Sequence, residues 1–97
     1  MSTQYLLKLY VDGMTPSALR AWRNLREISA ELEGEDHFEI ELIDISSDPG
    51  ARSRENILVT PTLVRSLPLP IRRLIGDLSD REQVIAGLEL LPLPATC

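Results

Sequence analysis

The stretch TPTLVRSLPLPIRRLIG, at residues 60–76, decides how the second half of this chain folds. Residues 63–65 and 71–75 are apolar and β-branched enough to predict two short strands. The prolines between them remove backbone donors and exclude a plain helix. An edge strand with a rigid turn explains this proline run as well as a functional role does. The stretch therefore predicts two strands, with a Thr-Pro step directly before the first of them.

Toward the N-terminus, signals for strands and helices alternate. Residues 5–11 read YLLKLYV, which is typical of a buried strand. Thr15 as N-cap and Pro16 at the first helical position begin a helix that runs to about residue 32. Residues 38–45 read FEIELIDI, in which apolar and acidic positions alternate, so we expect a half-buried strand there.

Two further helix starts flank the central stretch. Asp48, followed by proline, predicts the cap of a short polar helix. Ser79 and Glu82 have the spacing of a capping box and predict the start of the last helix. The segment VIAGLELL at residues 84–91 is ambivalent, because it reads equally well as a helix or a strand. Gly87 in mid-helix costs about 1 kcal/mol relative to alanine.

The resulting order, β-α-β-α-β-β-α, is the thioredoxin arrangement, an α/β class, in one domain spanning residues 1–97. We expect residues 92–97 to form a short flexible tail. Pro61 falls where the thioredoxin fold carries a cis proline. Residues 13–17 fall where that fold carries its redox cysteines, but they read GMTPS. The sequence therefore predicts the fold without its thiol chemistry.

Composition narrows the function further. The 97 residues carry 10 basic and 15 acidic side chains, a formal charge of −5, so a nucleic-acid partner is not expected. No apolar run is long enough to span a membrane, and no leader pattern opens the chain, so we expect a cytoplasmic location. The one cysteine, Cys97, is the last residue, and we interpret it as an incidental thiol.

The acidic and histidine side chains offer little for catalysis. His37 has no partners suited to a metal site, so we interpret it as a solvated loop histidine. Glu39 and Glu41 alternate with core residues and belong to a solvated strand face. Asp77 and Asp80 are explained by a turn and a helix start. The sequence therefore predicts no catalytic, cofactor or metal site, and no enzyme.

One run is long and specific, residues 67–82, which read LPLPIRRLIGDLSDRE. Shorter segments accompany it: Leu7-Lys8-Leu9-Tyr10-Val11 with Gly13, Thr15-Pro16, Leu42-Ile43-Asp44, Ile57-Leu58 and Thr60-Pro61-Thr62-Leu63. Through these residues the chain resembles the KaiB family of circadian-clock proteins over nearly its whole length.

This resemblance implies a protein with two folds. The resting KaiB form is typically a homotetramer whose second half folds as two helices and a strand, and we expect it to dominate in isolation. The rarer form is a thioredoxin-like monomer that binds the ATPase ring of KaiC, recruits KaiA and competes with a sensor histidine kinase. By position, the residues implied in the change of fold are Pro61, Pro68, Pro70, Gly87 and Glu89.

The resemblance also implies partner contacts. Arg20 and Arg23 match basic positions near the KaiA contact, although a solvated helix face explains them equally well. Cyanobacterial members tend to carry lysines that contact KaiC where this chain has Glu41 and Asn56. Glu39 lies on the same predicted strand as Glu41. The expected contact residues are therefore Glu39, Glu41 and Asn56, together with the two arginines. The reversed charge keeps an alternative open, a signalling or stress-response module that does not bind KaiC. A redox enzyme dependent on Cys97 is a third hypothesis, and we expect no such activity.

Overall fold

The computed structural model describes residues 3–34 and 36–90. The tail predicted at residues 92–97, with Cys97, lies outside the described residues. The elements follow the predicted order: β1 (Gln4–Val11), α1 (Pro16–Leu32), β2 (His37–Asp44), α2 (Pro49–Glu55), β3 (Thr62–Leu67), β4 (Arg72–Ile75) and α3 (Arg81–Gly87).

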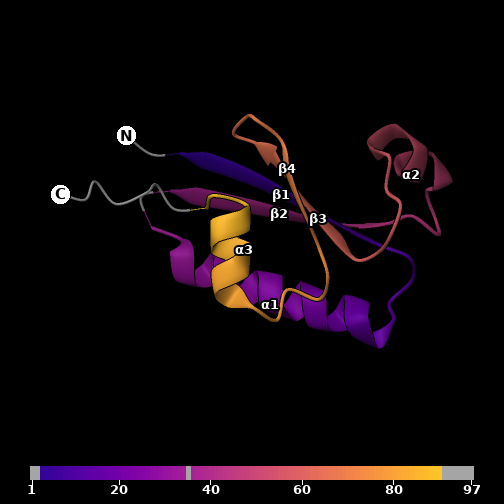
Figure 1. The fold of residues 1–97 in the computed structure, drawn as a ribbon, viewed down its shortest axis with the longest axis horizontal. Coiled ribbons are helices and arrows are strands. Elements are labelled where there is room, and N and C mark those ends of the chain that lie inside the picture. Colours follow the sequence, from indigo (N-terminus) through magenta and orange to yellow (C-terminus); the bar gives the residue numbers. More distant parts are fainter. Residues whose placement is uncertain (1–2, 35, 91–97) are drawn as a thin grey trace.

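The four strands form one sheet in the order β2-β1-β3-β4 (Figure 1). β1 is parallel to β2 and antiparallel to β3, and β4 is antiparallel to β3. The apolar run of β1 explains its central place, because an inner strand is covered on both faces. β2 and β4 are the edge strands, which leaves the acidic face of β2 at the rim of the sheet. The predicted thioredoxin-like α/β fold is confirmed.

The helices divide between the two faces of the sheet. α1 and α3 cover one face, where Leu7, Leu9 and Val11 of β1 pack against Leu25 of α1 and Leu88 after α3. Figure 1 shows α1 and α3 on the same side of the sheet, and α2 near the end of the sheet that is farther from α3.

α2 covers part of the opposite face. Tyr10, which alternates with the residues facing α1, forms a smaller core there with Ile45, Ala51, Ile57 and Val64. The rest of this face carries no helix among the described residues.

The predicted start of the last helix is wrong by one residue. The N-cap of α3 is Asp80, whose Oδ1 accepts a hydrogen bond from the backbone N–H of Gln83 at 3.1 Å. Ser79 instead donates its backbone N–H to Oδ1 of Asp77, also at 3.1 Å. An aspartate caps as well as a serine, and Ser79 is already engaged by the preceding turn.

The ambivalent segment after Asp80 is helical here up to Gly87. The peptide bond before Pro61 is cis, as the thioredoxin arrangement predicts, and the bonds before Pro68 and Pro70 are also cis. The tetrameric form with an altered second half stays a prediction. Within residues 3–34 and 36–90, no helix combines the length and apolarity that a membrane crossing needs.

Candidate partner-binding surfaces

The five predicted contact residues lie on two opposite surfaces. Glu39 and Glu41 point away from α1, because they alternate with Phe38, which packs on the α1 side. Asn56 ends α2, on that same opposite face. Arg20 and Arg23 lie on α1. The structure therefore brings three of the five predicted contacts to one side of the sheet and places the two arginines on the other.

On the side with Asn56, the end of the sheet carries an open depression of about 230 Å³, which we call the α2 cleft. Its side chains are mostly apolar, and two of them are unusually exposed: Leu58 is 76 % exposed and Ile75 is 64 % exposed. Large exposed aliphatic groups that gather in a concave site are typical of a protein-binding surface. The lining residues are Asn56, Ile57, Leu58, Val59, Thr62, Arg73 and Ile75.

The backbone of Asn56 shapes this cleft. Its φ of 54° and ψ of 50° place it in the left-handed region, and its N–H bonds the carbonyls of Arg52 and Ser53. Asparagine tolerates this conformation better than most residues, so it ends α2 and turns the chain into the cleft. Its side chain is exposed. Asn56 therefore has a structural role in addition to its predicted role as a contact.

Arg73 of β4 ties α2 to the sheet. Its Nη1 donates to the carbonyl of Asn56 at 3.2 Å, and its Nη2 donates to the carbonyl of Glu55. These are the last carbonyls of α2, which have no partner within the helix. A cation at a helix C-terminus is also favoured by the helix dipole. Sequence reasoning did not assign Arg73 a role, because nothing local indicates that β4 lies beside α2.

We expect Asn56→Gly to leave stability within about 0.5 kcal/mol of wild type, because glycine reaches the left-handed region freely. Asn56→Ala should destabilise the fold by about 1 kcal/mol, because a Cβ disfavours that conformation. Urea unfolding of both variants checks this difference. Equal stabilities for the two variants would show that the backbone of Asn56 is unstrained.

Tyr10 lies beneath the cleft and is almost fully buried. Burial, and the charge and hydrogen bond of the Glu55 carboxylate, raise the pKa of Tyr10 from 10.0 to about 12. The phenol is therefore neutral at physiological pH and holds the end of α2 against the sheet. Arg73 also contacts the end of this seven-residue helix, whose C-cap Asn56 lines the cleft.

The acidic positions on β2 lie on the same side of the sheet as the cleft but at its opposite edge, because β2 and β4 are the two edge strands. Both Glu39 and Glu41 are exposed. Glu41 is the sheet neighbour of Lys8 on β1, so one cation lies within the acidic strip. The predicted solvated strand face is confirmed.

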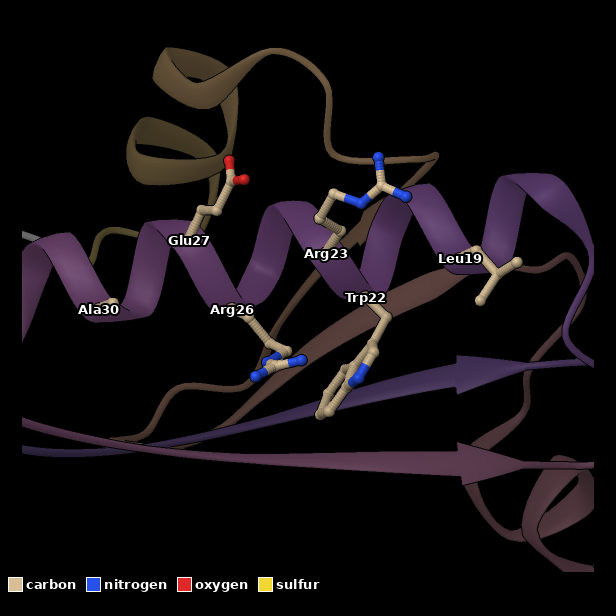
Figure 2. Close-up of a pocket in the computed structure, with 6 residues that line it drawn as sticks. All are labelled: Leu19, Trp22, Arg23, Arg26, Glu27 and Ala30. Carbon is tan, nitrogen blue, oxygen red and sulfur yellow. The ribbon is translucent and has the colours of Figure 1, made fainter.

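The second surface lies along α1, where a shallow depression of about 480 Å³ runs beside the helix. Figure 2 shows Trp22 and Arg26 pointing to one side of α1, and Arg23 and Glu27 pointing to the other. Leu19 is about half exposed at one end of this surface. An apolar surface with two arginines suits a partner that offers apolar and acidic groups.

The two predicted arginines on α1 differ in their surroundings. Nε of Arg20 bonds Oδ2 of Asp77 at 3.2 Å, so it is paired with the loop before α3. Hydrogen bonds from Ser79 and from Arg20 lower the pKa of Asp77 below its usual value. Arg23 forms no ion pair within the described part of the chain. Of the two, Arg23 is the better placed to meet a partner.

Four of the five residues implied in a change of fold lie near α3 or in the loop between β3 and β4, whereas Pro61 lies at the other end of β3. Gly87 is the last residue of α3, and an added Cβ would meet only Cδ1 of Leu74, at 3.6 Å. Glu89 has a φ of 51°, and its carboxylate pairs with Arg72 at 2.8 Å. Pro68 and Pro70 lie in the loop between β3 and β4, and Pro61 is buried before β3.

Nothing in the described residues assembles a catalytic constellation. They contain no group of three or more metal-ligating side chains. Nδ1 of His37 lies 3.0 Å from a carboxylate oxygen of Glu33 at the surface, and His37 begins β2 instead of lying in a loop. The exposed apolar and charged groups of the two surfaces suit contact with another protein.

Comparison of the sequence with known families gives one clear result. The profile of the KaiB domain family matches residues 8–90. A protein of Synechococcus elongatus, described as circadian clock oscillator protein KaiB, is 49 % identical over 87 residues, which cover 90 % of this chain and 84 % of the relative. A Prochlorococcus marinus protein with the same description is 51 % identical over 87 residues, covering 90 % and 82 %.

Comparison of structures points to the thioredoxin-like fold. The N-terminal domain of Synechococcus elongatus SasA superposes with a TM-score of 0.75 at 25 % identity, over 95 % of this chain and 90 % of that domain. A chloroplastic thioredoxin z superposes with a TM-score of 0.69 at 19 % identity, over 92 % of this chain and 81 % of the other. The second likeness is one of fold alone.

Proposed function

This chain belongs to the KaiB family, and from that membership we propose that it is a clock-type regulatory protein without catalysis of its own, which docks on the ATPase ring of a KaiC-type protein. The observation that carries the proposal is the identity of about half of all residues with circadian clock oscillator proteins over 90 % of the chain. A match of that extent includes both the α2 cleft and the segment that forms α3.

The α2 cleft is the docking surface in this proposal. Leu58 and Ile75 supply exposed apolar area, and Arg73 is fixed at the rim by the end of α2. Apolar anchors in a concave patch are the usual source of affinity, while the charged rim governs partner choice. Asn56 belongs to that rim, and in this proposal Glu39 and Glu41 add contacts from the opposite edge of the same side of the sheet.

The α1 surface is the second contact in this proposal. It lies across the sheet from the α2 cleft, so a partner there does not compete for the same residues. Arg23 and Arg26 give it positive charge, which suits an acidic partner such as a KaiA-like protein. Competition with a sensor histidine kinase for the ATPase, which the family resemblance implies, is part of this proposal, and the likeness of fold to the SasA domain supports it.

We propose that this docking takes place in the cytoplasm. A direct binding measurement with the isolated proteins tests it. The chain is incubated for hours with a KaiC homologue from the same source and with ATP, and complex formation is followed by size-exclusion chromatography. We expect co-elution with the ATPase ring. The ring alone and the chain alone give the reference volumes. No complex after a day of incubation would count decisively against docking on this ATPase.

The substitutions at Glu41 and Asn56 favour a second candidate, a KaiB-like signalling or stress-response module with a different partner. The double variant Glu41→Lys/Asn56→Lys separates the two. If only the double variant binds a cyanobacterial KaiC, the surface is correct and the wild-type charges direct this chain to another partner. If wild type binds its own KaiC homologue, the second candidate is wrong.

A further inference from the structure

One arginine lies inside the protein. Arg65 on β3 is only 3 % exposed, and it shares the sheet face of Leu63, which packs under α1 and α3. A buried charge is costly unless polar groups surround it. Its immediate surroundings therefore reveal what its guanidinium holds in place.

Three backbone carbonyls surround this guanidinium. Nη1 of Arg65 donates to the carbonyl of Leu88 at 2.8 Å and to that of Glu89 at 3.3 Å. Nη2 donates to the carbonyl of Pro70 at 2.7 Å. Within residues 3–34 and 36–90, no carboxylate pairs with Arg65, and its Nε has no hydrogen-bond partner. The charge is thus balanced by the end of α3 and by one residue of the proline loop.

These contacts matter because α3 is short. A seven-residue helix is not stable alone and depends on tertiary contacts. Val84 and Leu88 bury its apolar side. Its two ion pairs, Arg72 with Glu89 and Arg81 with Glu31, are about half exposed, and such pairs contribute little. Arg65 is the one charged group that reaches the end of α3 from within the core described here.

We propose that Arg65 is a latch that keeps α3 and the loop at residues 68–71 docked together on the sheet. Its planar fork reaches two chain segments at once, with one nitrogen on each. Releasing it frees the end of α3 while β1, β2 and α1 stay folded, because none of its three hydrogen bonds goes to those elements. This inference does not depend on the proposed function.

Hydrogen exchange tests the latch in the intact chain. The informative amides are those of Leu88 and Leu90, which bond the carbonyls of Val84 and Ile85. In Arg65→Met, three carbonyls lose their charged donor, and we expect exchange at these amides to accelerate about 10- to 100-fold. Exchange in β1 should change less than about 3-fold.

Two further variants keep the test decisive. Arg72→Met removes a neighbouring arginine whose ion pair is exposed, and we expect less than about 3-fold acceleration at the same amides. Arg65→Lys keeps the charge but not the fork, and it should give an intermediate acceleration. If Arg65→Met does not fold, the lysine variant decides alone. Unchanged exchange near Leu88, or equal acceleration in β1, would overturn the latch.

Discussion

Replacing Leu58 with aspartate is expected to weaken binding to a KaiC-type ATPase by at least about 100-fold, without unfolding the chain. Leu58 is the most exposed apolar residue of the α2 cleft, at 76 %. If a partner covers it, a carboxylate there becomes buried without a counter-charge of its own. A loss of 100-fold corresponds to about 2.8 kcal/mol, which is the scale of an interface hot spot.

A matched control is available in the same chain. Leu69 is 71 % exposed and lies in the loop between β3 and β4, at the opposite end of that hairpin from the cleft. We expect Leu69→Asp to change affinity by less than about 3-fold, since exposed substitutions away from a contact are nearly neutral. Titration of each variant against the ATPase gives both values. If the two variants bind equally well, the cleft is not the docking surface.

Alkaline pH is expected to destabilise the wild-type chain far more than a Tyr10→Phe variant. The folded pKa of Tyr10 is raised to about 12, from 10.0, by burial and by Glu55. A group whose folded pKa is raised stabilises the fold fully below its unfolded pKa, and this stability is lost as pH rises through the folded pKa. A shift of two units corresponds to about 2.7 kcal/mol, lost between pH 10 and 12.

The measurement is urea unfolding of both proteins between pH 8 and pH 12. Other groups that titrate in this range, including Tyr5, whose pKa burial also raises, are common to both proteins and cancel in the difference. At pH 8, Tyr10→Phe should be about 1 kcal/mol less stable than wild type, because the hydrogen bond to Glu55 is missing. The two stabilities should cross as pH rises. Parallel curves would show that Tyr10 ionises as it does in an unfolded chain.

Most of the fold follows from local patterns. The apolar run of β1, the Thr15 cap with Pro16, and the alternation in β2 each specify one element through contacts between near neighbours in sequence. The side chain of Thr15 accepts a hydrogen bond from the N–H of Ala18, as its place before Pro16 predicts. The last cap was misplaced because Ser79 and Asp80 are adjacent and equally suited to the position.

The sequence predicted the candidate site less completely than it predicted the fold. The predicted contacts Glu39, Glu41 and Asn56 share a side of the sheet, whereas Arg20 is engaged by Asp77. The apolar residues of the cleft were not predicted as a group. A hydrophobic residue in a strand-like run is expected to be buried, so the sequence does not indicate that Leu58 and Ile75 are exposed. The role of Arg73 was not predicted, because nothing local in the sequence indicates that β4 lies beside α2.

By itself, then, the sequence determined the element order, the absence of redox cysteines at residues 13–17 and the likeness to the KaiB family. Each of these depends only on residues that are close together in the sequence. Only the tertiary structure decided which arginines are free, paired or buried. Arg23, Arg20 and Arg65 look alike in sequence. They differ because a charge takes its role from groups that the fold brings from tens of residues away, such as Asp77 to Arg20 and the end of α3 to Arg65.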